Sequence, residues 1–189
     1  MLQLILKASI AIFGVMDPVG NVPVFMSLTD RMSMKERRAI AVKSVARASL
    51  ILLFFVFFGN WVLDAFQISY ESFRIASGLV LVFLGFQILF GFRFNRDAAA
   101  EEDISVVPLA MPLIAGPGTI TTAVIFTKEF GYVPTLVGLG VNLLLSLLLF
   151  KYAHLVTRLI GRKGSLVFAR VMGLILIAIG VEFARNGII

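Results

Sequence analysis

The chain has 189 residues, of which 59% are hydrophobic and only 15% are charged, and its mean hydropathy is +0.99. A water-soluble domain of this size with that composition would aggregate, so the sequence indicates an integral membrane protein in contact with the lipid bilayer. The net charge of +6 comes from basic residues that alternate with apolar segments instead of forming one patch, which argues against nucleic acid as a partner. Cysteine is absent, which excludes thiol–disulfide carriers and zinc-thiolate sites.

Six apolar segments are predicted to span the membrane. A hydrocarbon core of about 30 Å requires about 20 helical residues at about 1.5 Å per residue. In chain order, the predicted spans are residues 4–29, 48–63, 75–92, 104–127, 130–150 and 165–185. The predicted fold class is therefore an all-α polytopic membrane protein, with residues 1–189 forming a single membrane domain. No cleavable signal peptide is expected, because the first segment lacks a small-residue cleavage site.

Basic residues are distributed unevenly between the two sides of these spans. Thirteen of the 17 Lys and Arg residues fall on one side, and only Lys7, Arg74, Lys128 and Arg185 fall on the other. The positive-inside rule then places the first set in the cytoplasm and both termini on the outer face. The acidic and alanine-rich segment 95–103 is predicted to be a cytoplasmic linker between two halves, residues 1–94 and 104–189.

The two halves resemble each other. Residues 13–21 match residues 111–119 when Gly20 is aligned with Gly118, and Gly78 and Gly85 match glycines at 173 and 180. Because each half holds three spans, the second half must enter the membrane from the opposite face, which gives an inverted 3+3 repeat of the kind found in secondary transporters. For the third and sixth spans alone, such glycines indicate only close helix packing, and they also allow a homodimer. The repeat depends on the first and fourth spans matching as well.

The first and fourth spans are predicted to be broken near the middle of the membrane. Proline has no backbone N–H to donate, and glycine permits non-helical dihedral angles. Both residue types cluster near the midpoints of these spans, which fall at 18–19 and at 115–116. The predicted break residues are Pro18, Pro23, Pro112 and Pro117, accompanied by Gly20, Gly116 and Gly118.

Backbone groups freed at this depth need partners, because each one left unsatisfied costs several kcal/mol. We expect Asn21 in the first half, and Thr119, Thr121 and Thr122 in the second, to cap new helix N-termini whose dipoles favour an anion such as a carboxylate. The alternative is a pair of proline kinks required only for packing. Because the cluster occurs twice at mid-depth, we favour a substrate site formed by Asp17, Gly20, Asn21, Gly116, Gly118, Thr119 and Thr122.

Asp17 is the most informative single residue, since an ionisable group at the bilayer centre costs about 2.5–3.5 kcal/mol on insertion scales. Three roles remain open: a cap that holds the break, a partner for a substrate amine, or a protonatable coupling group. Its counterpart in the second half is Ala115, so a charge role is confined to one half. Glu182 is a second coupling candidate. It and Gln87 occupy equivalent repeat positions that we expect one turn from the outer interface, where a polar helix end is the alternative to a proton relay.

Signatures of enzymes and metal sites are missing from the sequence. It contains no Gly-rich phosphate loop, no paired His on a helix and no Gly-x-Ser-x-Gly elbow. The lone His154 has no other His or Cys with which to form a metal site. We therefore expect neither catalysis nor a cofactor, and the energy for any transport would come from an ion gradient.

The segments 17–23 and 112–122, each opening one half of the chain, together resemble the MarC family over almost the whole sequence. The resemblance implies a six-span protein of the prokaryotic cytoplasmic (inner) membrane. It also implies a relation to SnatA-type transporters of small neutral amino acids such as alanine and glycine. The hypothesis from the sequence is a secondary transporter or exporter of small polar metabolites, driven by a proton or sodium gradient. A non-transporting membrane scaffold is the rival hypothesis, and an intramembrane enzyme ranks third.

Overall fold

The computed structural model describes residues 1–29, 32–90 and 109–188, and in this part of the chain all regular secondary structure is helical. The all-α fold class is thus confirmed. The predicted linker at 95–103 lies outside the described residues. The helices are α1 (Leu2–Met16), α2 (Asn21–Leu28), α3 (Met34–Ala65), α4 (Tyr70–Phe90), the short π-helix η2 (Leu109–Ile114), α5 (Pro117–Phe130), α6 (Tyr132–Lys151) and α7 (Ala153–Asn186).

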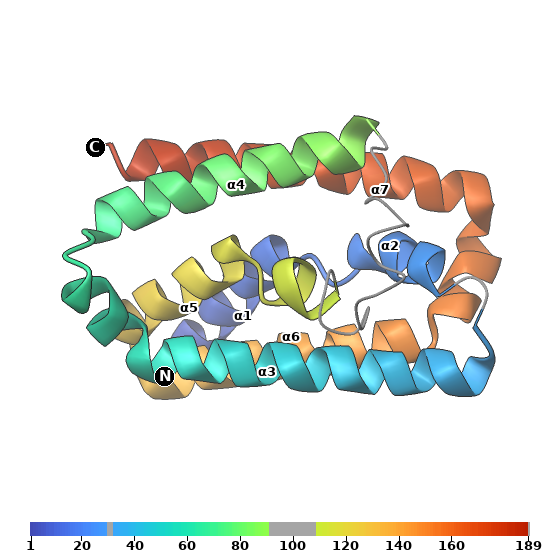
Figure 1. The fold of residues 1–189 in the computed structure, drawn as a ribbon, viewed down its shortest axis with the longest axis horizontal. Helices are drawn as coiled ribbons and strands as arrows, with labels where there is room; N and C mark the ends of the chain where they lie inside the picture. The colour runs from blue at the N-terminus through green and yellow to red at the C-terminus, as the bar shows by residue number, and fades with distance from the viewer. Residues whose placement is uncertain (30–31, 91–108, 189) are drawn as a thin grey trace.

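Long helices enclose the short ones. Figure 1 shows α4 and α7 side by side along one edge of the molecule and α3 and α6 along the opposite edge, and both pairs are in contact. The broken elements α1, α2, η2 and α5 lie between these two pairs. Both chain termini lie at the same end of the molecule. This arrangement places the two breaks in the interior.

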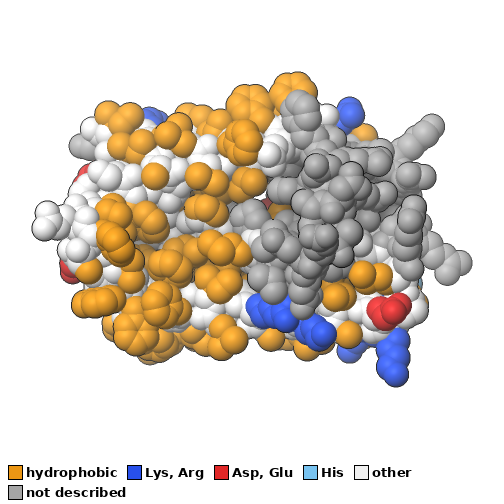
Figure 2. All heavy atoms as spheres, viewed as in Figure 1, with side chains coloured by type: hydrophobic (Ala, Val, Ile, Leu, Met, Phe, Trp, Pro, Cys, Tyr) orange, Lys and Arg blue, Asp and Glu red, His pale blue; other side chains and the backbone are white. Residues whose placement is uncertain are grey.

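The exterior is apolar, as contact with lipid requires. Large hydrophobic side chains are exposed along the outer helices, among them Phe57 and Trp61 on α3, Phe83 on α4 and Leu144 on α6. Figure 2 shows such side chains spread over the left half of one face. Contiguous apolar patches of this extent are rare on water-soluble monomers. Two of the described helices, α3 and α6, are each long and apolar enough to cross a membrane, while α1 is apolar but shorter.

The core holds the broken helices against α3 and α6. Phe25 of α2 and Phe150 of α6 are fully buried and stacked, with ring centroids 4.5 Å apart. Asn142 of α6 donates its amide hydrogens to the carbonyl of Ser9, at 2.9 Å, and to its own helix. Asn142 thus makes a polar contact between α6 and α1.

Glycines allow α4 and α7 to approach until their backbones touch. A Cβ built on Gly180 would lie 2.6 Å from the carbonyl oxygen of Gly78, and one on Gly85 would lie 2.7 Å from that of Gly173. The predicted close packing of these glycine faces is confirmed. Because the two faces pack against each other within one chain, however, they no longer indicate a homodimer.

Helix α3 begins earlier than the predicted span at 48–63, and its first turns carry the basic residues Lys35, Arg37 and Arg38. A capping box starts it: the amide of Ser33 donates to the Glu36 carboxylate at 2.8 Å, and the Glu36 amide donates to the Ser33 hydroxyl at 3.3 Å. The 32 residues of α3 extend about 48 Å, well beyond the hydrocarbon core. The charged start of α3 is the part of the helix least suited to lipid, and Arg37 there donates to the carbonyl of Thr29 at the end of α2.

We expect the start of α3 to loosen in acid. Hydrogen bonds from the side chain and backbone of Ser33 hold the pKa of the exposed Glu36 carboxyl below its usual value. A lowered pKa in the folded state means that the stabilisation is present at neutral pH and is lost as the pH falls through the folded-state value. Amide hydrogen exchange of residues 34–37 should therefore accelerate in acid, relative to the intrinsic rate, more than that of the middle of α3. In Glu36→Gln this extra acid sensitivity should vanish.

Candidate functional site

The first break is a four-residue turn between α1 and α2 that is organised by Asp17. Asp17 ends α1 in the left-handed conformation, with φ 45° and ψ 62°, which Asp and Asn tolerate better than most residues. Its carboxylate accepts a hydrogen bond from the amide of Gly20 at 2.9 Å, and its carbonyl accepts one from the amide of Asn21 at 3.1 Å. The carboxylate thus occupies the positive end of the α2 dipole.

The second break is built differently. Met111 is extended, with φ −136° and ψ 127°, as expected for a residue that precedes proline. The amide of Ala115 bonds the carbonyl of Ala110 at 2.8 Å, which is the wider spacing of a π-helix. Pro117 then starts α5 at its first helical position, where a missing N–H costs little. No side chain caps this end, so the first amides of α5 have no partner supplied by a cap.

The two predicted break positions are confirmed, but two details are corrected. Pro23 lies in the first turn of α2 and not in the break. A helix tolerates proline at its third position, because the amide there has no intrahelical partner in any case. The predicted capping by Asn21, Thr119, Thr121 and Thr122 is wrong: neither α2 nor α5 has a side-chain cap bond. The Thr121 hydroxyl instead donates to the carbonyl of Pro117 at 2.8 Å and bonds Ser77.

Asn21 links the two breaks. Its side-chain amide donates to the carbonyl of Met16 at 2.9 Å, in the first break, and approaches the carbonyl of Leu113 at 3.5 Å, in the second. Both carbonyls are groups that an unbroken helix would have satisfied. Asn21 therefore acts as a donor to freed carbonyls, which sequence reasoning missed because the second carbonyl is 92 residues away.

Replacing Asn21 with leucine should destabilise the protein by about 1–3 kcal/mol, because the Met16 carbonyl would remain buried without its donor. The change keeps a side chain of similar size, so little of the loss should come from a cavity. Denaturation in mixed detergent micelles would measure it. Ser9→Ala, which leaves its main-chain carbonyl to Asn142 intact, serves as a control in α1 and should change stability by less than about 0.5 kcal/mol.

A cleft lies where the two breaks meet the α4–α7 pair. Five of the predicted substrate residues line it: Asp17, Asn21, Gly116, Gly118 and Thr119. Gln87 of α4 also lines it, and apolar side chains of α1, α2, η2, α4 and α7 complete the wall. The space between the atoms of the cleft, its open mouth included, amounts to about 530 Å³, but water-sized molecules can occupy only about 30 Å³ of it, room for about two waters.

Three predicted residues lie outside the cleft: Gly20, Glu182 and Thr122. Gly20 is buried under the Asp17 carboxylate and is not part of the cleft lining. Glu182 is exposed near the end of α7, where it accepts from Arg185 at 2.6 Å and from Asn186 at 3.1 Å, as expected of a polar helix end. The prediction that Gln87 lies near the outer interface is wrong, because α4 and α7 run in opposite directions and equivalent positions fall at different depths.

Thr122 lines a second cavity, which it shares with Arg74 and Asn186 and with apolar residues of α1, α5 and α7. We call this cavity the outer vestibule, because it lies toward the end of the molecule that carries both termini, the predicted outer face. The Thr122 side chain is only 3% exposed, and its hydroxyl has no hydrogen-bond partner. An orphaned buried hydroxyl costs about 1–3 kcal/mol, so this position calls for a ligand or a water.

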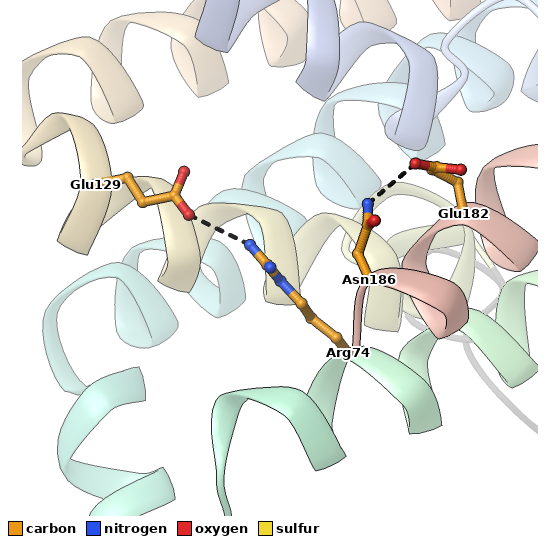
Figure 3. A network of polar contacts seen from close by, with 4 residues as sticks. All are labelled: Arg74, Glu129, Glu182 and Asn186. Carbon is orange, nitrogen blue, oxygen red and sulfur yellow. Dashed lines mark hydrogen bonds and ion pairs between the residues drawn. The ribbon is translucent and has the colours of Figure 1, made fainter. Parts of the chain in front are cut away.

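Charged residues gather around the mouth of the vestibule. Figure 3 shows Arg74 extending from α4 toward Glu129 of α5, with Asn186 and Glu182 of α7 nearby. Arg74 and Glu129 form an ion pair at 3.2 Å across the two halves of the chain. Among the residues that the structure describes, no group of three or more His, Cys, Asp or Glu side chains is placed to hold a metal ion.

Comparison with known proteins identifies the family. The model of the MarC family integral membrane proteins matches residues 2–189. The UPF0056 membrane protein MJ1677 of Methanocaldococcus jannaschii is 39% identical, covering 99% of this chain and 97% of its own. YhcE of Escherichia coli is 34% identical (96% and 90%), and YvbG of Bacillus subtilis is 30% identical (100% and 95%); both are named UPF0056 membrane proteins. No solved structure matches. The chain is thus an integral membrane protein of the MarC family, which occurs in bacteria and archaea.

Proposed function

We propose that this protein is a secondary transporter or exporter of small polar metabolites, in particular small neutral amino acids. It works by alternating access between two inverted three-helix repeats in the cytoplasmic membrane, with both termini on the outer face and a proton or sodium gradient as the energy source. In this proposal the protein is not an enzyme. The observation that carries it is the meeting of two helix breaks, one of them charged, at a single cleft in the middle of the fold.

The packing of the helices supports an inverted repeat of six spans. The contact of α1 with α6 corresponds to that of η2 with α3, and the contact of α2 with α7 corresponds to that of α5 with α4. Between α4 and α7, Gly78 lies opposite Gly180 and Gly85 opposite Gly173. When each of these glycines is replaced by its aligned counterpart in the other half, the Gly78–Gly180 contact becomes the Gly173–Gly85 contact. Such correspondence is expected when one half rocks against the other around a fixed site.

The two breaks offer different chemistry to a zwitterion. The Asp17 carboxylate already balances the positive dipole end at the start of α2. The start of α5 has no side-chain cap and faces the cleft through Gly116, Gly118 and Thr119. A substrate carboxylate fits the free α5 dipole, and a substrate ammonium or a coupling proton fits Asp17. Small neutral amino acids are also the cargo that resemblance to SnatA-type transporters implies.

The proposal is tested by uptake into liposomes. Purified protein should accumulate radiolabelled alanine or glycine when a proton or sodium gradient is imposed, and Asp17→Asn should abolish that uptake. Asparagine keeps the left-handed backbone and an acceptor for the Gly20 amide, so the variant should remain folded and lose only the charge. Wild-type protein that moves neither amino acid under either gradient would sink the substrate claim.

The rival function, a non-transporting scaffold, is favoured by one observation: the cleft leaves only about 30 Å³ for water-sized molecules. In a transporter this narrow cleft must widen to admit an amino acid, whereas in a scaffold it stays narrow. Water-soluble labels applied from each side of the membrane separate the two.

A further inference from the structure

The outer vestibule has the features of a binding site, although the sequence singled out only Thr122 from it. It leaves about 100 Å³ for water-sized molecules, against about 30 Å³ for the cleft between the breaks. Its lining combines apolar side chains such as Ile125 and Phe183 with three polar residues, Arg74, Thr122 and Asn186. A mostly apolar wall with a few convergent polar groups is typical of small-molecule sites.

The Thr122 hydroxyl is the first sign of a ligand. Thr121, Thr127 and Thr135 each donate to the carbonyl four residues earlier in their own helix. Thr122 makes no such bond, although its side chain is as buried as theirs. Its hydroxyl oxygen is buried in the wall of the vestibule without a partner, so a rotation of the Thr122 side chain would let it bond an oxygen atom of a molecule there.

Arg74 determines the charge of that molecule. It is the only charged residue in the described lining, since Glu129 and Glu182 lie outside it. Its pairing with Glu129 is a single contact of 3.2 Å between side chains that are 31% and 49% exposed. Partly solvated pairs of this kind are weak, so Arg74 can exchange Glu129 for another carboxylate at little cost. Its planar guanidinium matches a carboxylate with two parallel hydrogen bonds.

We propose that the outer vestibule binds the carboxylate group of a small organic solute, with the Arg74 guanidinium and the Thr122 hydroxyl as donors. The inference deepens the proposed transport function and rests on it for the identity of the solute, an amino acid on the outer side of the membrane. Val15 lines both cavities, so the vestibule adjoins the cleft. The vestibule is thus a first binding station, distinct from the site at the breaks.

The test is calorimetric titration of the purified protein with three probes: propionate, which has a carboxylate and no amine; L-alanine, which has both; and propylamine, which has no carboxylate. Propionate and L-alanine should bind and compete with each other, and propylamine should displace neither. Arg74→Gln should weaken propionate binding at least tenfold, and Arg74→Lys by less, because it keeps the charge and loses the planar donor geometry.

Three further variants separate binding from folding. Thr122→Val removes a hydroxyl that has no partner, so thermal stability should hold or rise while propionate binds about fivefold more weakly. Glu129→Gln removes the carboxylate that is paired with Arg74 and should tighten propionate binding about threefold. Arg185→Gln changes an exposed arginine at the same end of the molecule, outside the lining, and should leave binding within twofold.

The inference is overturned if the wild-type protein binds neither propionate nor L-alanine, if Arg74→Gln leaves propionate binding within twofold, or if Glu129→Gln weakens it. A failure of this inference can be distinguished from a failure of the proposed transport function. Propionate binding that depends on Arg74, in a protein that moves no alanine, supports the vestibule and contradicts transport. Alanine uptake in a protein whose propionate binding does not depend on Arg74 supports transport and contradicts the vestibule.

Discussion

Alanine at Gly78 or at Gly180 should destabilise the folded protein by about 2–3 kcal/mol per substitution. In each case the added Cβ meets backbone atoms of the partner helix, such as Val82 N at 2.8 Å from a Cβ on Gly180, and backbone cannot rotate away. Overpacking of a tight interface typically costs about 1–3 kcal/mol, and contact between helices in lipid depends chiefly on such close packing. Denaturation of the purified variants in mixed detergent micelles measures the loss.

Gly140 provides the matched control. It also lies in the interior of a membrane helix, α6, but a Cβ there would meet no atom within 4 Å. Gly140→Ala should therefore stabilise the protein by about 0.4–1 kcal/mol through the smaller entropy of its unfolded chain. Equal effects at positions 78, 180 and 140 would show that the α4–α7 contact does not hold the fold together.

Gly20→Ala should collapse the turn between α1 and α2 and abolish transport. Its Cβ would lie 2.6 Å from Cγ of Asp17 and 2.8 Å from Oδ1, and closer still to Oδ2, so the carboxylate would have to leave the Gly20 amide. Losing a hydrogen bond to a charged group costs about 1.5–3 kcal/mol. Stability in detergent and alanine uptake in liposomes should both fall.

Two comparisons isolate the cause. Gly14→Ala, in α1 before the break, brings its Cβ only to 3.6 Å from Ile179 and should leave stability and uptake close to wild type. In the Asp17→Ala background, Gly20→Ala should cost almost nothing further in stability, because the nearest atoms to its Cβ all belong to the Asp17 carboxyl. Additive losses in the double variant would contradict this explanation of the turn.

The sequence was sufficient to locate the breaks, because proline and glycine act locally. The predicted midpoints at 18–19 and 115–116 fall between Met16 and Asn21 and between Ile114 and Pro117. The bounds of the second span were less predictable. The Ser33–Glu36 capping box that starts α3 has a recognisable spacing, and charge counting alone overlooked it.

The chemistry of the site was less predictable than its position, because it depends on contacts between distant segments. Asn21 was expected to cap its own helix, yet it donates to a carbonyl of η2. Thr119 and Thr122 are three residues apart on α5, but they line different cavities. Gln87 joins the cleft only because α4 lies against α5 and the breaks, which no local pattern indicates.

Cysteine labelling at position 119 tests most directly whether solute passes through the centre of this molecule. The chain has no cysteine of its own, so Thr119→Cys gives one thiol in the wall of the cleft, and Val124→Cys gives a buried control on the same helix outside both cavities. A membrane-impermeant thiol reagent should label position 119 from either side of oriented vesicles. Adding alanine or imposing an ion gradient should change the labelling rate. Position 124 should never be labelled. A thiol at 119 that stays unreactive from one side under every condition would contradict alternating access and favour the scaffold.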